Sequence, residues 1–279
     1  MQNDKQWFSP EYGFFGEFYQ RGDNSKKGYL SNVIQTQEQR TEEEVKGIIR
    51  LLNPQWLSPS YHPILPTPPS ICDCPCGIGR HSIKLANEGY HVVAMDLNPD
   101  QLDVGKKKTQ WIPLSQRPIF TEENMLNLDS YWFNKFDAVI NMFFSFGFFY
   151  TDEENKKVTQ NFFNLLKPGG KFLMHADVNM ARIKNGKYKF KEKRQLVNGE
   201  YLEIMEHYNP LTKRIEGIWE IGDDKHSYEA KEYSVRVYEN EEFVALCRSV
   251  GFKEVKIYSD WQGSPYSEDS EMVIFVAQK

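Results

Sequence analysis

Ile71-Cys-Asp-Cys-Pro-Cys-Gly-Ile-Gly-Arg-His-Ser82 is the stretch of sequence that decides the fold. It places two glycines, Gly77 and Gly79, between an expected strand at 70–74 and an expected helix at 80–88. Glycine lets the backbone turn tightly and approach a ligand closely. The first turn of the helix adds free N–H groups and a positive dipole end. The loop therefore predicts a binding site for a nucleotide-like ligand.

An acidic residue supplies the second half of this signal. Asp96 ends the next expected strand, 17 residues after Gly79. A carboxylate at this point can accept hydrogen bonds from both hydroxyls of a ribose. The alternative is that Asp96 caps the helix expected from Pro99, but Asn98 suits that role better. Loop and acid together predict an adenosine-type cofactor.

The residues around the loop indicate which cofactor this is. A dinucleotide fingerprint needs a third glycine for close packing beside a pyrophosphate, and Gly79 is followed here by Arg-His-Ser. Asp73 at the strand end would repel a pyrophosphate but suits a ligand with a cationic ammonium group. S-adenosylmethionine (SAM) carries an adenosine and an ammonium group and no phosphate. We therefore favour SAM and keep an NAD-dependent oxidoreductase as an alternative.

Strands and helices alternate on both sides of this loop. The expected strands are 70–74, 90–95, 118–120, 136–141 and 171–176, and the expected helices are 80–88, 98–108 and 151–166. Such alternation predicts a mostly parallel sheet with helices on both faces. Thr41-Glu-Glu-Glu44 predicts a capping box that starts an earlier helix. A helix at 240–250 and strands at 252–258 and 271–277 complete the pattern.

The chain divides into four parts. We expect an arm at 1–40, a cofactor-binding core at 41–185, an insertion at 186–238 and the end of the core at 239–279. The arm is rich in aromatic residues and is either packed on the body or a flap over a site. Three extended segments, 196–208, 214–221 and 227–238, predict that the insertion is antiparallel. Six prolines between 53 and 70 predict an irregular connector.

Five motifs in order resemble those of the class I SAM-dependent methyltransferases, over about residues 45 to 180. Residues 73–79 resemble the family's first motif, with Pro75 in place of its first glycine. Asp96 matches the ribose-binding acid, and Asn124-Met125 matches the loop along the adenine. Residues 136–141 resemble the strand that ends beneath the SAM methyl group, and 165–170 match the turn before the fifth strand.

The resemblance implies a seven-stranded, mostly parallel sheet, an N-terminal flap and an antiparallel β insertion. It also implies SAM as the cofactor and S-adenosylhomocysteine as its product. The residues expected to bind the cofactor are Asp73, Cys74, Cys76, Gly77, Gly79, Asp96, Leu97, Asn98, Asn124, Met125, Asn141 and Arg40. Arg40 is our candidate for the SAM carboxylate.

The acceptor site is harder to read from the sequence. The aromatic loop after the fourth strand faces the transferred methyl group in this fold, so Phe143 and Phe144 are candidates to line the site. His175 and Asp177 end the fifth strand, where each is either a catalytic base or a structural polar residue. The arm offers two tyrosines, Tyr19 and Tyr29, as further contacts. The nitrogen, oxygen or carbon nature of the acceptor atom is left open.

Composition limits the partners. The chain has 34 basic and 39 acidic residues, a net charge of −5, which disfavours nucleic acid. No apolar run is long enough to span a membrane, and the first residues lack a signal-peptide pattern, so we expect a cytoplasmic protein. Cys72, Cys74 and Cys76 lack a second cluster, so we expect no metal. We expect a small-molecule substrate and a monomer or homodimer, with a non-catalytic SAM-binding module as another alternative.

Overall fold

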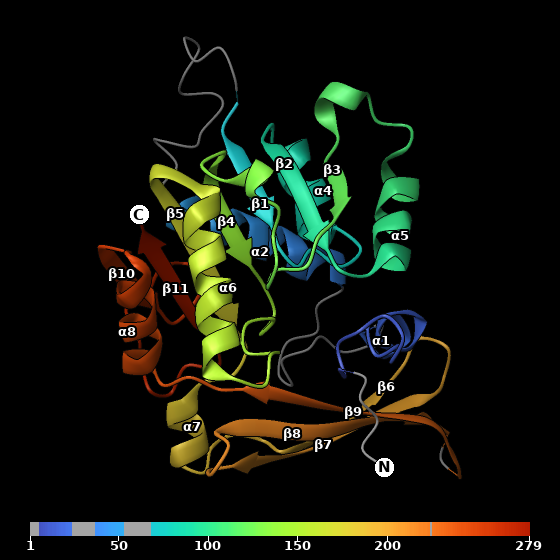
Figure 1. The fold of residues 1–279 in the computed structure, drawn as a ribbon. Coiled ribbons are helices and arrows are strands. Elements are labelled where there is room, and N and C mark those ends of the chain that lie inside the picture. Colours follow the sequence, from blue (N-terminus) through green and yellow to red (C-terminus); the bar gives the residue numbers. More distant parts are fainter. Residues whose placement is uncertain (1–5, 24–36, 53–67, 224) are drawn as a thin grey trace.

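The computed structural model describes residues 6–23, 37–52, 68–223 and 225–279. Its main feature is a seven-stranded sheet with the strand order β10-β11-β5-β4-β1-β2-β3 (Figure 1). The strands are β1 (Ser70–Asp73), β2 (His91–Asp96), β3 (Ile119–Glu122), β4 (Phe136–Asn141), β5 (Leu166–Ala176), β10 (Glu254–Tyr258) and β11 (Val273–Gln278). The first five strands pair in parallel and the last two are antiparallel. The predicted fold class is confirmed.

Helices cover both faces of this sheet. They are α2 (Gln37–Leu52), α4 (Arg80–Asn87), α5 (Pro99–Thr109), α6 (Asp152–Leu165) and α8 (Asn240–Val250), with short 3-10 turns at Leu114–Gln116 and Ser130–Trp132. Figure 1 shows α6 and α8 in front of the sheet and α2 behind it. Successive side chains of a strand point to opposite faces. Accordingly Val139 packs in the core beneath α6 and α8, whereas Ala138 and Ile140 pack with α2 and α4.

Helix starts were predicted with mixed success. Asn98 caps α5, and Thr151 and Glu154 form the expected capping box of α6. The capping box expected at Thr41 and Glu44 is wrong, because α2 already begins at Gln37. The Thr41 hydroxyl instead donates to the Gln37 carbonyl within the helix, and the Glu44 carboxylate faces Arg80 and His81.

The insertion forms a second, antiparallel sheet below the first (Figure 1). This insertion sheet consists of β6 (Lys191–Gln195), β7 (Tyr201–Asn209), β8 (Arg214–Gly222) and β9 (Ser227–Arg236), in that order. The expected extended segment at 196–208 is corrected, because its first residues form the turn between β6 and β7. Strand β6 reads Lys-Glu-Lys-Arg-Gln and has no apolar alternation that a sequence reading could detect.

The N-terminal segment packs its rings into the body. Trp7, Phe8, Phe14 and Phe18 are buried, and helix α1 (Glu17–Asp23) lies beside the insertion sheet (Figure 1). The Trp7 ring is 4.7 Å from that of Phe148 in the loop after β4. A short helix, α7 (Met180–Lys184), leads into the insertion.

Most of the expected proline-rich connector, residues 53–67, lies outside the described residues. Within the described residues, no helix is both long and apolar enough to cross a membrane.

Candidate active site

The strand order reverses between β1 and β4, and ligands of open α/β sheets bind at such a switch point, beside the carboxyl ends of the strands. A cavity of about 340 Å³, the first cavity, lies here. Its wall is formed by the glycine loop, the ends of β2, β3 and β4, and the N-terminal segment. The residues that line it include Tyr19, Asp23, Cys74, Cys76, Gly77, Arg80, Asp96, Leu97, Asn98, Asn124, Met125 and Phe143.

The glycine loop has a shape that only glycine fits. Gly77 and Gly79 have φ values of 56° and 75°, in the left-handed region. A Cβ on Gly77 would lie 2.8 Å from the Gln101 side-chain oxygen, and one on Gly79 would lie 2.5 Å from the Phe120 ring. The backbone therefore folds closely against α5 and β3 and presents its surface to the cavity.

Asp96 is fixed by the loop that it faces. Its carboxylate accepts hydrogen bonds from the backbone N–H of Gly77 at 2.7 Å and of Asn98 at 2.9 Å. Burial raises the pKa of Asp96, and these hydrogen bonds oppose that rise. The side-chain amide of Asn98 donates to the Phe15 carbonyl and ties the N-terminal segment to this corner.

Asp73 lies behind the cavity wall. The Ser82 hydroxyl donates to one of its carboxylate oxygens at 2.6 Å. The other oxygen is buried and has no hydrogen-bond partner among the described residues. Burial raises the pKa of Asp73 to about 7, and the hydrogen bond from Ser82 and the charge of Arg80 oppose that rise only in part. An ammonium group is the ligand chemistry that such an orphaned oxygen accepts.

The sequence-derived cofactor residues fall into two groups. Eight of them line the first cavity, namely Cys74, Cys76, Gly77, Asp96, Leu97, Asn98, Asn124 and Met125. Asp73, Gly79, Asn141 and Arg40 are not among the lining residues. The Arg40 guanidinium is paired with Asp23 at 3.2 Å and lies 4.9 Å from the centre of the Phe143 ring. Tyr29 lies outside the described residues.

Several lining residues had no signal in the sequence. Asp23 from α1, Gln37 from α2 and Glu123 after β3 all face the first cavity. The first two come from a region without hydrophobic periodicity, and only the fold brings them to the glycine loop. Arg80 also lines the cavity, and its guanidinium lies 4.3 Å from the centre of the Phe143 ring.

A second cavity, of about 420 Å³, adjoins the first. Phe15, Tyr19, Phe143 and Phe148 line both. The rest of its wall comes from the N-terminal segment, the end of β5, α7 and the inner face of the insertion sheet. Tyr19 is half-buried and lines both cavities, and burial raises the pKa of its hydroxyl.

The loop after β4 is held in an unusual conformation. Phe143 and Phe144 have φ values of 57° and 53°, which cost free energy for residues with a Cβ and persist only when neighbours fix them. The backbone N–H of Phe144 donates to the His175 carbonyl at 3.0 Å, and that of Phe143 reaches the His175 ring nitrogen Nδ1 at 3.4 Å. Both phenylalanines line the second cavity.

The two candidate bases occupy different places. His175 is buried behind the loop and lines neither cavity, and burial lowers its pKa to about 4. A neutral imidazole at this site accepts the hydrogen bond from Phe143. Asp177 lines the second cavity, and burial raises its pKa to about 6.

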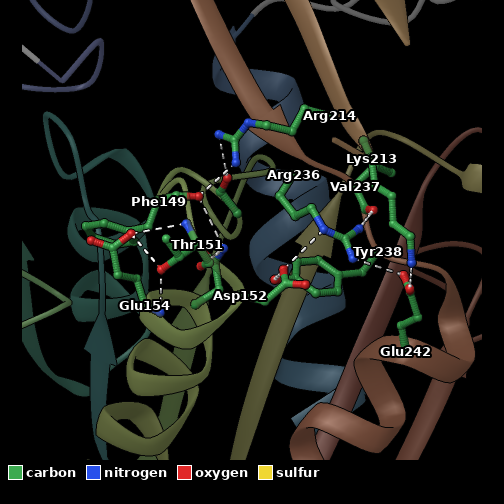
Figure 2. Close-up of polar contacts among 12 residues, drawn as sticks. Phe149, Thr151, Asp152, Glu154, Lys213, Arg214, Arg236, Val237, Tyr238 and Glu242 are labelled. Carbon is green, nitrogen blue, oxygen red and sulfur yellow. Dashed lines mark hydrogen bonds and ion pairs between the residues drawn. The ribbon is translucent and has the colours of Figure 1, made fainter. Parts of the chain in front are cut away.

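Two buried arginines join the insertion sheet to the loop after β4. Figure 2 shows Arg214 of β8 above the backbone of that loop and Arg236 of β9 beside the start of α6. Arg214 donates to the carbonyls of Gly147, Phe148 and Phe149. The backbone N–H of Arg236 donates to the Gly147 carbonyl at 2.9 Å. The sheet that encloses the second cavity and the loop that lines it are thus one connected unit.

Comparisons with known proteins agree with this fold. Residues 71–170 match the family model described as a methyltransferase domain. That range runs from β1 through the glycine loop to the first residues of β5. The chain therefore carries a methyltransferase domain on a sheet of the class I fold.

Individual relatives are more distant. A glycine/sarcosine N-methyltransferase of Parasynechococcus marenigrum (strain WH8102) is 24% identical over 213 residues, which are 75% of this chain and 71% of the relative. Among solved structures, the CcbJ methyltransferase of Streptomyces caelestis has a TM-score of 0.69 at 16% identity and covers 85% of this chain and 94% of its own. SAM-bound CalS10, an amino pentose methyltransferase of Micromonospora echinaspora, has a TM-score of 0.59 at 18% identity, covering 88% and 92%.

Proposed function

We propose that the chain transfers a methyl group from SAM in the first cavity to a small organic molecule in the second. The single observation that carries this proposal is the shared wall. Four aromatic residues line both cavities, namely Phe15, Tyr19, Phe143 and Phe148. The two cavities therefore adjoin, and ligands bound in them would come together beside these rings. Methyl transfer needs donor and acceptor aligned in a site without water, and a wall of apolar rings favours both conditions.

The first cavity offers a partner for each polar part of SAM. Asp96, fixed by two backbone N–H groups, would accept hydrogen bonds from the ribose hydroxyls. Asn124 and Met125 would lie along the adenine. The orphaned oxygen of Asp73, close behind the wall, would attract the ammonium group. When bound, SAM supplies a methyl group that leaves its sulfur for the acceptor atom and yields S-adenosylhomocysteine.

Asp177 is our candidate for the group that takes a proton from the acceptor. It lines the second cavity beside Phe143 and Phe144, whereas His175 lines neither cavity. A pKa near 6 leaves most of the carboxylate ionised at neutral pH, as a general base requires. The role of His175 is then to hold the Phe143–Phe144 turn in place.

The relatives support an acceptor of low molecular weight. The glycine/sarcosine methyltransferase and the amino pentose methyltransferase are both named for small amines. A net charge of −5 agrees with a partner other than nucleic acid. We further expect a monomer or homodimer that works in the cytoplasm.

Thermal unfolding with SAM, S-adenosylhomocysteine and NAD, each titrated separately, tests the cofactor. A ligand at about 100 times its Kd adds roughly 2.7 kcal/mol to the free energy of unfolding. For a chain of this length, the midpoint should rise by about 5–10 °C. A rise with SAM or its product and none with NAD is expected. A rise with NAD alone would overturn the proposal, and SAM binding without methyl transfer to any acceptor would point to a non-catalytic module.

A further inference from the structure

The inner face of the insertion sheet carries a charge where its pattern calls for an apolar residue. Along β7, Leu202 and Ile204 are buried and point toward the body of the protein. Glu206 is the next residue on that face, and its side chain lines the second cavity. Taking a carboxylate out of water has a free-energy cost unless hydrogen bonds or a bound cation compensate it.

Two tyrosines compensate part of that cost. The Tyr188 hydroxyl donates to one carboxylate oxygen of Glu206 at 3.0 Å, and the Tyr233 hydroxyl donates to the other. Both tyrosines also line the second cavity. Burial still raises the pKa of Glu206 in spite of these two hydrogen bonds. The carboxylate is therefore fixed in direction but remains without a cationic partner among the contacts described for it.

The sheet is shaped to allow this arrangement. Glu206, Gly217 and Tyr233 lie in one row across β7, β8 and β9. A Cβ on Gly217 would lie 2.7 Å from the Tyr233 ring, because that ring crosses directly over the glycine. Only a residue without a side chain lets Tyr233 reach across the middle strand to Glu206. A glycine in the centre of a strand normally weakens the strand. At position 217 it makes room for the hydrogen bond between Tyr233 and Glu206.

The surroundings of Glu206 complete a site for a positive group. Trp7 and Phe14 from the N-terminal segment have ring centres 6.0 and 5.5 Å from that of Tyr233. Aromatic faces attract cations, and a second carboxylate, Asp177, lines the same cavity. Arg182 and Arg194 on this wall are ion-paired with Glu271 and Glu192. The wall also carries three lysines, Lys189, Lys191 and Lys193, at the start of the insertion.

We propose that Glu206, positioned by Tyr188 and Tyr233, binds the amino group of the methyl acceptor, so that the acceptor is an organic amine. This inference rests on the proposed function, since it assigns the acceptor of that same reaction. The amine N–H groups donate to the carboxylate, and the rings of Trp7 and Phe14 cover its apolar neighbours. A hydroxyl compound of the same shape supplies one donor and no charge, and it binds more weakly.

The test uses the full chain saturated with S-adenosylhomocysteine and a panel of small molecules in matched pairs, each amine with its hydroxyl counterpart. Calorimetry measures their affinity, and release of S-adenosylhomocysteine from SAM measures transfer. We expect binding and methylation of amines at least tenfold above their hydroxyl partners. Preference for the hydroxyl compounds, or no binding by any amine, would overturn the inference.

Three variants distinguish a role of the Glu206 carboxylate in amine binding from an effect on folding. Glu206→Gln keeps the size and should lower amine affinity at least tenfold, with affinity for S-adenosylhomocysteine unchanged. Gly217→Ala should give a similar loss, because it displaces Tyr233 and so removes one of the two hydrogen bonds that orient the Glu206 carboxylate, while Glu206 itself is unchanged. Glu203→Gln, on the exposed face of the same strand, is the matched control and should bind like the wild type. Equal amine affinity in Glu206→Gln and wild type would refute the role of Glu206.

The outcome also separates this inference from the proposed function. If the protein binds neither SAM nor its product and transfers no methyl group, the proposed function fails first. If it methylates hydroxyl or carbon acceptors instead, the proposed function stands and only the assignment to amines fails.

Discussion

The Arg214 guanidinium donates a hydrogen bond to the Phe149 carbonyl at 2.8 Å, across the boundary between the two sheets. The same group also reaches the carbonyls of Gly147, Phe148 and Ser234. Arg214→Met would remove these four hydrogen bonds, although the Gly147 and Phe149 carbonyls keep donors in the Arg236 backbone N–H and the Asn155 amide. Hydrogen bonds to a charged group contribute about 1.5–3 kcal/mol each, so we expect a total loss of about 3 kcal/mol or more in the free energy of unfolding, measured with urea.

The neighbouring residue supplies the control. Lys213 pairs with Glu242 at the surface, where its side chain is 48% exposed, and exposed ion pairs contribute about 0–1 kcal/mol. Lys213→Gln should therefore lower stability by no more than about 1 kcal/mol. Equal losses in the two variants would show that the buried guanidinium does not secure the loop.

Asp96→Asn tests the ribose contact. Gly77 and Asn98 donate to different carboxylate oxygens, so the amide can accept only one of these two hydrogen bonds, and the negative charge is lost. Hydrogen bonds to a charged group contribute about 1.5–3 kcal/mol. We expect the Kd for SAM, measured by calorimetry, to rise by roughly 10- to 100-fold. Asp103→Asn, on the exposed side of α5, serves as the control, and an unchanged Kd in Asp96→Asn would contradict the assignment.

The pH dependence of transfer tests Asp177. Because burial raises its pKa to about 6, the carboxylate is ionised above that pH and becomes protonated below it. A base is active in its ionised form, so kcat should fall about tenfold per pH unit below 6. Asp177→Asn should lower kcat by about 10²- to 10⁴-fold and remove this limb from the profile. A limb that survives the substitution would exclude Asp177 as the group that titrates.

The burial of His175 predicts how the free energy of unfolding depends on pH. Its pKa is near 4 in the folded protein because of burial and about 6.5 in an unfolded chain. Between these values the unfolded state binds the extra proton, so acidification from pH 6.5 to 4 favours unfolding. His175→Gln removes the imidazole that would take up this proton in the unfolded state. The stability of the wild type should therefore fall relative to the variant by about 1.4 kcal/mol per pH unit in this window. A constant difference across the window would contradict the prediction.

Much of the fold could be predicted because its signals are local. The glycine loop, the acid at the end of β2 and the capping residues Asn98 and Thr151 each act within a few positions of the sequence. Runs of apolar residues indicate the core strands in the same local way. Eight of the expected cofactor residues line the first cavity because the family resemblance fixed the loops that carry them.

The second cavity could be predicted only in part. Tyr19, Phe143, Phe144 and Asp177 are candidates from the sequence that line it, but the rest of its wall could not be foreseen. Its decisive contacts join residues far apart in the chain, such as Glu206 with Tyr188 and Tyr233, and no local pattern encodes them. The Gly217 position reads as a weak point in a strand until the register places it beneath the Tyr233 ring. Thr41 and Glu44 show the converse error, because a motif with the right spacing serves a tertiary contact with Arg80 instead of a helix start.

Different parts of the chain line the two cavities, and this has a consequence for how the substrate could change in evolution. Among the described residues, those lining the first cavity all lie at or before Phe149, whereas the insertion contributes only to the second. If the second cavity binds the acceptor as we propose, substitution or recombination within 191–236 would change which molecule is methylated, while the residues that line the first cavity stay the same. Arg214 and Arg236 limit such an exchange. An insertion from another protein would pack on this core only if it kept both arginines or supplied other donors to the carbonyls of residues 147–149.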